Sequence, residues 1–62
     1  MDERALRLAF GCVIRERRAR LGLSQERVAE CSGLHRTYIS LLERGVKSPT
    51  LNSAFDLAVA LG

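Results

Sequence analysis

The sequence of 62 residues contains no tryptophan, one proline and one histidine, and aromatic residues make up 5% of it. Its apolar runs are a few residues long, and Asp2 and Glu3 stand where a signal peptide would be apolar, so we expect neither a membrane span nor a signal peptide. It also lacks paired carboxylates for a catalytic pocket and a phosphate-cradling glycine loop, and a chain this short leaves little room for a cleft. We therefore expect a soluble domain that is not an enzyme.

The only two cysteines are Cys12 and Cys31, which both fall beside apolar residues in predicted helices. Nothing indicates a secreted protein, so we expect buried free thiols rather than a disulfide. Structural zinc takes four ligands, and Cys31 with His35 is the best pair that the sequence offers. We expect no bound metal and no cofactor.

The composition is that of a globular domain, with 47% hydrophobic and 27% charged residues. A chain of this size forms one small core, so residues 1–62 are predicted to be a single domain. Ten basic residues against seven acidic ones give a net charge of +3, and nine of the ten are arginine. Between residues 15 and 20 four arginines cluster, which fits a solvated helix face, a nucleic-acid contact or a membrane-surface helix.

Hydrophobic periodicity predicts an all-α fold, because no segment alternates long enough to form a strand. Ser24 and Thr50 are typical helix N-caps, and Gly33 is typical of a helix end. The apolar stripe of the first helix is predicted to comprise Leu6, Phe10, Val13, Ile14 and Leu21. The helices are expected at about 4–20, 25–31, 36–44 and 51–61.

A tight turn, Ser32-Gly33-Leu34, joins the second and third predicted helices. Two short helices joined in this way must cross at a steep angle. Ala29 permits their close approach, and Ile39 and Leu42 pack the third helix against the core. This spacing is typical of a helix-turn-helix, with its core at about residues 25–44 of a compact bundle of four or five helices.

The run Leu21-Gly22-Leu23-Ser24-Gln25-Glu26, with Gly33-Leu34, Ile39-Ser40 and Glu43-Arg44-Gly45, resembles the lambda-repressor-like, XRE-type DNA-binding domain over roughly residues 9–62. His35-Arg36-Thr37-Tyr38-Ile39-Ser40 is also similar to the recognition helix of restriction–modification controller proteins, a subgroup of that family. The resemblance implies a cytoplasmic transcriptional regulator of bacterial or phage origin that binds double-stranded DNA, commonly inverted repeats, as a homodimer. Family members continue into a fifth helix or a further domain, so we expect a DNA-binding fragment or a minimal, weakly dimerising domain.

Helical geometry places one polar face of the third helix opposite the core. A major groove admits such a helix, and Arg36 could donate two hydrogen bonds to guanine O6 and N7, which is worth about 1–3 kcal/mol of discrimination. Thr37 and Ser40 can bond a base or a phosphate, and Leu41 can touch a thymine methyl group. The expected base-reading residues are Arg36, Thr37, Ser40 and Leu41.

Phosphate contacts are expected on both sides of this helix. The family has a residue that clamps a backbone phosphate at the position of Gln25. The alternative is that Gln25 is an ordinary polar residue in the first turn of a helix. Free N–H groups at the start of the fourth helix attract phosphate near Thr50, although capping is its main expected role. The expected backbone contacts are Gln25, Arg44, Lys47, Ser48, Thr50 and Asn52.

The resemblance also implies a structural ion pair. The family pairs an arginine with a glutamate at the positions of Arg18 and Glu43, and we expect this pair to be partly buried. The family usually has an aliphatic residue at the position of Arg17. We therefore expect either a thin core at this position or an Arg17 side chain that snorkels, with its apolar part on the core and its charged end in water. His35 occupies an N-cap position where Ser, Thr or Asp is usual.

Phe55 and Val59 are spaced i, i+4 on the fourth helix, and the family more often has a polar residue at Val59. They form either a satellite of the core or an apolar patch for a second subunit or domain. Two other functions also stay open. The same fold serves as an antitoxin-like or coactivator-like protein-interaction module, and residues 4–20 could lie on a membrane surface.

Overall fold

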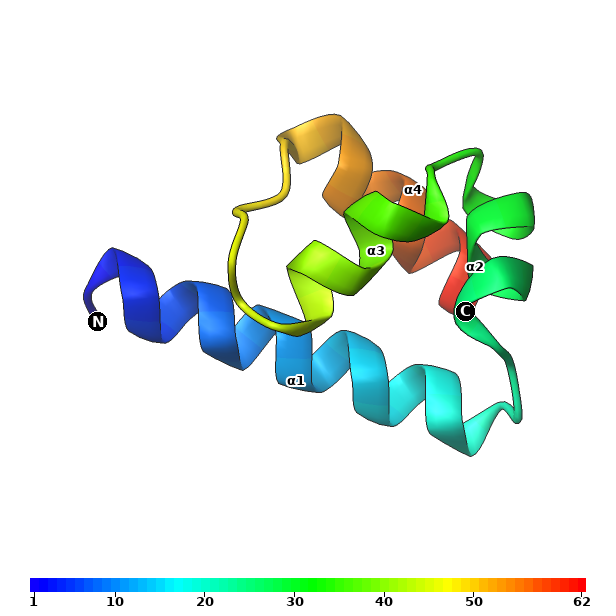
Figure 1. Ribbon diagram of the computed structural model, residues 1–62, viewed down its shortest axis with the longest axis horizontal. Coiled ribbons are helices and arrows are strands. Elements are labelled where there is room, and N and C mark those ends of the chain that lie inside the picture. The colour runs from blue at the N-terminus through cyan, green and yellow to red at the C-terminus, as the bar shows by residue number, and fades with distance from the viewer.

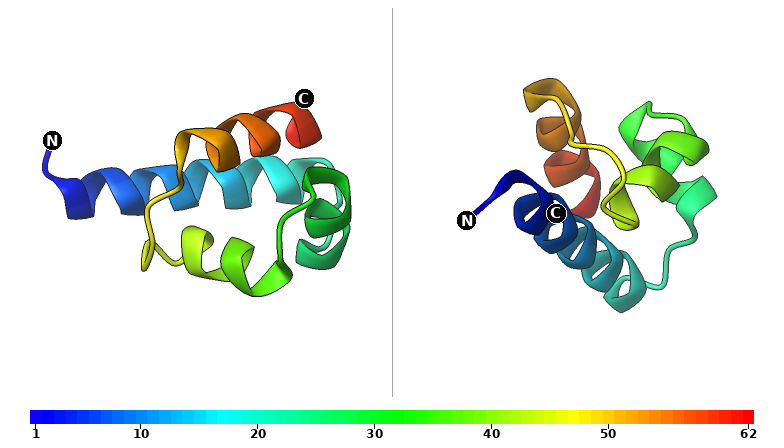
Figure 2. Two further views of the ribbon diagram at one scale, coloured as in Figure 1. Left: turned by 90° about the horizontal axis from the view of Figure 1, so that it is seen from above. Right: turned by 60° about the vertical axis from the view of Figure 1, so that its left-hand side comes forward.

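The computed structural model describes residues 1–62 and contains four helices and no strand, as the sequence predicts. The longest helix, α1, underlies the other three, and its N-terminal turns extend beyond them (Figure 1). In the view from above, α3 and α4 lie on opposite sides of α1 (Figure 2, left). The helices are α1 (Glu3–Arg20), α2 (Gln25–Ser32), α3 (Arg36–Glu43) and α4 (Leu51–Leu61).

Side-chain caps set the start of three helices. The side-chain oxygens of Asp2, Ser24 and Thr50 each accept a hydrogen bond from the backbone N–H three residues later. Such a bond satisfies an N–H group that has no partner within the helix. His35 precedes α3 in the same extended conformation but makes no side-chain capping bond, so the first turn of α3 keeps unpaired N–H groups.

The core lies where all four helices meet. Its buried members are Val28 from α2 and a larger set from the other helices, namely Ile14, Ile39, Leu42, Leu57 and Leu61. The tight turn between α2 and α3 ends α2 at Gly33, whose φ of 75° is the left-handed conformation that favours glycine. This turn holds α2 and α3 as the predicted helix-turn-helix.

The predicted apolar stripe of α1 is wrong at three positions. Leu6 and Val13 are 59% and 62% exposed, and Leu21 is exposed as well. Leu6 lies in the N-terminal part of α1, whose first turns extend beyond the other helices (Figure 1), and Val13 lines an open groove between α1 and α4. The helix is therefore covered along only part of its apolar face.

A glycine that the sequence analysis did not single out lets α1 cross the end of α3. A Cβ atom on Gly11 would collide with the backbone carbonyl oxygens of Leu42 and Glu43. Because backbone atoms cannot give way as a flexible side chain can, this crossing requires glycine. It brings the middle of α1 within reach of the last residues of α3.

The expectation of buried thiols is wrong. Cys12 and Cys31 are free, but both are exposed. Cys12 lies on the outward face of α1, where its Sγ is 3.7 Å from a carboxylate oxygen of Glu16, and Cys31 lies in the last turn of α2. No three His, Cys, Asp or Glu side chains are grouped so as to hold a metal ion. No helix is long and apolar enough to cross a membrane.

Candidate nucleic-acid interface

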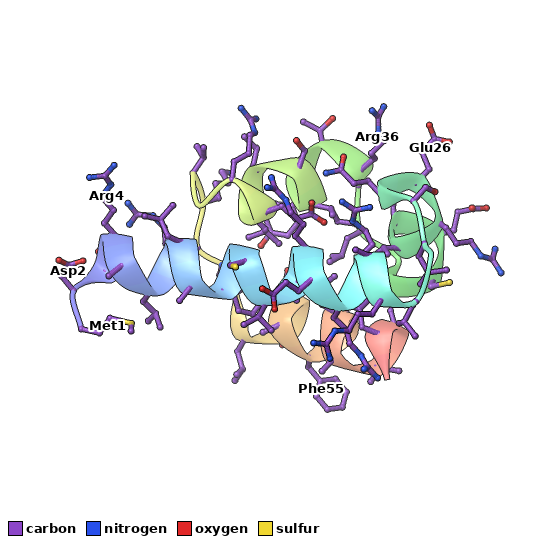
Figure 3. The ribbon with its side chains drawn as sticks, turned by 90° about the horizontal axis from the view of Figure 1, so that it is seen from below. Met1, Asp2, Arg4, Glu26, Arg36 and Phe55 are labelled. Atoms are coloured by element: carbon purple, nitrogen blue, oxygen red, sulfur yellow. The ribbon has the colours of Figure 1, made fainter.

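The outward face of α3 gathers most of the predicted base-reading side chains. Arg36 and Thr37 are exposed, and Ser40 and Leu41 are half-buried. A shallow hollow of about 160 Å³ is lined entirely by polar residues, namely Gln25, Arg36, Thr37 and Ser40. The structure thus brings the start of α2 and the first turns of α3 to one polar surface, from which Arg36 projects (Figure 3).

The charge on this face is mainly positive. The only acidic residue of α3 is Glu43, and none of its side chain is exposed. Glu26 of α2 projects on the same side of the molecule as Arg36 (Figure 3), and the two line a neighbouring hollow with Arg18, Ser24 and Gln25. A carboxylate therefore borders the polar surface at α2, while α3 itself presents no exposed negative charge.

Behind the surface lies a buried carboxylate with three hydrogen-bond donors. Arg18 donates from Nε to Glu43 Oε2 at 2.7 Å and from Nη2 to Oε1 at 3.0 Å, and Gln25 Nε2 donates to the same Oε1 at 3.1 Å. Nη1 of Arg18 donates to the backbone oxygen of Leu23 at 3.0 Å. Arg15 adds a positive charge, with its Nε 3.7 Å from Oε1. The expected pair of Arg18 and Glu43 thus meets in a bidentate arrangement, with Glu43 more deeply buried than expected.

The surroundings of Glu43 keep it ionised. Burial raises the pKa of its carboxyl group, but the hydrogen bonds from Arg18 and Gln25 and the charges of Arg18 and Arg15 outweigh burial, so this pKa lies below its ordinary value. The hydrogen bond to Glu43 in turn raises the pKa of Arg18. At neutral pH Glu43 is a carboxylate, which can accept hydrogen bonds but cannot donate them.

The link between Gln25 and Glu43 is a feature that sequence reasoning missed. The two residues are 18 positions apart and belong to different helices. Neither helical periodicity nor a motif joins them, since Gln25 is the first residue of α2 and Glu43 the last residue of α3. The packing of α2 against α3 brings them together.

The loop after α3 is tied to the rest of the molecule at two points. Arg7 Nε donates to the backbone oxygen of Gly45 at 3.1 Å, a contact that the sequence did not indicate. Lys47 Nζ lies 6.0 Å from the centre of the Tyr38 ring, at the limit of a cation–π contact. The exposed polar side chains at the end of α3 and in this loop are those of Arg44, Lys47 and Ser48.

Thr50 and Asn52 stand apart from the hollow at α3. The Thr50 hydroxyl caps α4 by accepting from the Ser53 N–H at 3.0 Å and donates to Ser53 Oγ at 2.9 Å. Asn52 is exposed and lines a different hollow with Phe55 and Asp56. The structure therefore assigns Thr50 its expected cap and leaves Asn52 free on the surface of α4.

The outer face of α4 is apolar. Phe55 and Val59 are 68% and 67% exposed, so the alternative that they are a satellite of the core is wrong. Leu51 continues the same row one turn earlier and is also exposed. Phe55 and Arg36 project from opposite sides of the molecule (Figure 3). This apolar row is therefore well separated from the polar surface of α3.

Arg17 snorkels, and its guanidinium reaches the C-terminal end of α4. Its Nε donates to the backbone oxygen of Leu61 at 3.0 Å and its Nη2 to that of Gly62 at 3.3 Å. These bonds satisfy carbonyl groups at the C-terminal end of α4, where a positive charge also suits the helix dipole. The side chain lines the groove between α1 and α4 beside Val13, so Arg17 ties the two helices together.

Comparison with known proteins places this arrangement among DNA-binding regulators. A family model described as helix-turn-helix matches residues 14–62. Control protein C.BamHI of Bacillus amyloliquefaciens is 41% identical over 58 residues, which are 92% of this chain and 72% of that protein. Control protein C.SmaI of Serratia marcescens is 56% identical over 39 residues, which are 63% of this chain and 46% of that protein.

A solved structure that is similar to this chain is also that of a controller protein. The crystal structure of the restriction-modification controller protein C.AhdI from Aeromonas hydrophila matches with a TM-score of 0.89 at 44% identity. The match covers 92% of this chain and 86% of that one. The resemblance drawn from the helix-turn-helix motif is thereby confirmed, including its similarity to controller proteins.

Proposed function

Because the chain belongs to the XRE-type helix-turn-helix family, we propose that it binds double-stranded DNA sequence-specifically, regulates transcription and has no enzymatic activity. The observation that carries this proposal is the polar surface formed by Gln25, Arg36, Thr37 and Ser40. α3 has eight residues, and an α-helix with its side chains is about 10–12 Å in diameter. Its exposed face fits the B-DNA major groove, which is about 12 Å wide.

In this proposal, the N-terminal half of α3 reads the bases. Arg36 donates two hydrogen bonds to a guanine, since its guanidinium is exposed at the first position of the helix. Thr37 and Ser40 lie next to it and bond a base or a phosphate, and Leu41 contacts a thymine methyl group. A G·C pair in each half-site follows from Arg36.

The DNA backbone is contacted from both ends of the motif. Gln25 donates to a phosphate from the start of α2, and Arg44 and Lys47 neutralise phosphates beyond the end of α3. The exposure of Arg44 and Lys47 beside a helix without exposed acidic groups supports this role, and half-buried Gln25 lines the polar hollow with Arg36. Ser48, Thr50 and Asn52 complete the proposed set of backbone contacts.

We further propose that two copies bind an inverted repeat in the cytoplasm. The apolar row of Leu51, Phe55 and Val59 lies on the side away from Arg36 and is free to pair with the same row of a second copy. A two-fold dimer would place its two α3 helices in half-sites about one helical turn apart.

Selection from a pool of randomised duplexes tests the proposal, followed by fluorescence-anisotropy titration across a salt series. We expect an enriched inverted repeat whose guanine preference weakens in Arg36→Ala by about 1–3 kcal/mol. Arg4→Ala is the matched control, because it removes the same charge from the exposed N-terminal part of α1 (Figure 3). It should lower affinity slightly for every sequence and leave the guanine preference unchanged.

A steep salt dependence without any enriched sequence would contradict the proposal, because it would show phosphate attraction alone. The protein-interaction module of the same fold would then be the better explanation, with the outer face of α3 bound to a protein.

A further inference from the structure

The Gln25 side chain is held in one orientation by the buried carboxylate behind it. A primary amide has an NH2 end that donates and an oxygen that only accepts. Ionised Glu43 accepts only, so the NH2 end of Gln25 must face it, as the 3.1 Å contact from Nε2 to Oε1 shows. One N–H of Nε2 is thereby engaged, and the second N–H and the amide oxygen stay available to a ligand.

The carboxylate is itself fixed from the opposite side. Arg18 holds both oxygens of Glu43 and is anchored by its own bond to the backbone oxygen of Leu23, in the turn before α2. A chain of hydrogen bonds thus runs from that turn through Arg18 and Glu43 to Gln25. No buried side-chain nitrogen or oxygen lacks a hydrogen-bond partner, so this hydrogen-bond network is complete.

We propose that Glu43 is a positioning residue for DNA binding, which orders the Gln25 amide before the duplex arrives so that its free N–H meets a phosphate. This inference rests on the proposed function. Gln25 lines both hollows beside Arg36, so the ordered amide borders the surface that Arg36 presents to a groove.

The physical advantage is entropic. A free glutamine side chain has three rotatable bonds, and binding must freeze them. A side chain that is already held in its bound orientation avoids that loss when the complex forms. The carboxylate therefore has a role in binding in addition to its role as partner of Arg18.

The first test uses the free protein and needs no variant. The sequence contains one glutamine, Gln25, and one asparagine, Asn52, so only two side-chain amide groups appear in a ¹⁵N NMR spectrum. Asn52 is exposed on α4 and makes no hydrogen bond through its side chain in the structure, which makes it an internal control. We expect the Gln25 amide to be rigid on the nanosecond scale and Asn52 to be mobile. Equal mobility of the two groups would overturn the proposal.

The second test is a binding cycle on the duplex enriched in the selection experiment. The variant pair Arg18→Met with Glu43→Leu removes the acceptor without changing net charge, and apolar replacement of a buried ion pair commonly preserves the fold. We expect this pair to weaken binding roughly fivefold, as one hydrogen bond would, and Gln25→Ala to do the same. Adding Gln25→Ala to the pair should cost less than about a further twofold.

The outcomes separate this inference from the proposed function. If the wild-type chain selects no sequence, both fail. If it binds a selected site, three results overturn the positioning role alone: losses that multiply in the combined variant, an apolar pair that binds like the wild-type chain, or a Gln25→Ala variant without effect. A rigid Gln25 amide together with losses that do not multiply supports it.

Discussion

The two opposite faces of the bundle are built differently. At the α2–α3 face, the Gln25 side chain is held from behind by Glu43, whose carboxylate accepts three hydrogen bonds and is fully buried. At the outer face of α4, the side chains of Leu51, Phe55 and Val59 are exposed to solvent. The first face is ordered for a polar ligand before it binds. The second is an uncovered apolar surface, which is typical of a site that binds another apolar surface.

The largest expected effect comes from breaking the network that orders the polar face. Glu43→Ala leaves half-buried Arg18, whose side chain is 19% exposed, without its ionic partner, so the cost lies at the lower end of the about 3–5 kcal/mol that removing one member of a buried ion pair costs. In a domain of this size, such a loss approaches the whole stability. Urea unfolding followed by circular dichroism measures it.

The control for that variant is Glu30→Ala, which removes an exposed carboxylate 3.9 Å from Arg27 on α2. Exposed pairs contribute little, so its stability should stay within about 0.5 kcal/mol of the wild-type value. Equal losses in the two variants would show that the polar face is no more rigidly built than the surface around it.

Acid should weaken the polar face by a smaller amount. The pKa of Glu43 is lower in the folded chain than in the unfolded one, so the unfolded chain takes up its proton first as the pH falls. The stabilisation is complete above the ordinary glutamate pKa of about 4.3 and is lost as the pH falls through the lowered folded value. Urea unfolding between pH 7 and pH 3 checks this.

The variant pair Arg18→Met with Glu43→Leu isolates the contribution of Glu43 to that pH dependence. It lacks the carboxylate, so its stability should fall less steeply below pH 4.3 than that of the wild-type chain. Parallel curves for the two proteins would mean that other carboxyl groups account for the acid sensitivity.

The sequence predicts most of the polar face, because its signals are local. As N-caps, Ser24 and Thr50 predict where their helices begin, and Gly33 predicts the turn between α2 and α3. The positions of Arg18 and Glu43 follow from the family resemblance. Each of these features depends on residues a few positions apart or on a motif whose spacing is fixed.

What the sequence does not predict depends on how the helices pack. The hydrogen bond between Gln25 and Glu43 arises only when α2 packs against α3, and the close approach at Gly11 only when α1 crosses the end of α3. Periodicity identifies the apolar side of a helix but not how much of it a neighbour covers, which is why Val13 belongs to the predicted apolar stripe and is nevertheless exposed. The hydrogen bonds of Arg17 depend on where α4 ends.

The smallest effect on folding is expected from substitutions at the apolar face of α4. A variant there distinguishes this face from the polar face, because it should change association and not stability. Phe55→Ser with Val59→Ser replaces side chains that are already exposed, so unfolding of the monomer should change by no more than about 0.5 kcal/mol. If the row joins two copies, association measured by sedimentation equilibrium should weaken, as should binding to the inverted repeat, while affinity for a single half-site stays unchanged.

Leu6→Ser is the matched control, since Leu6 is a large apolar side chain of similar exposure near the start of α1. It should affect neither association nor DNA binding. A loss of monomer stability above 1 kcal/mol in the α4 variant would contradict the comparison, because it would show that Phe55 and Val59 contribute to folding. Unchanged association would instead remove the row from the dimer interface. Neither result depends on the polar face, because Arg36 projects from the side of the molecule opposite Phe55 (Figure 3).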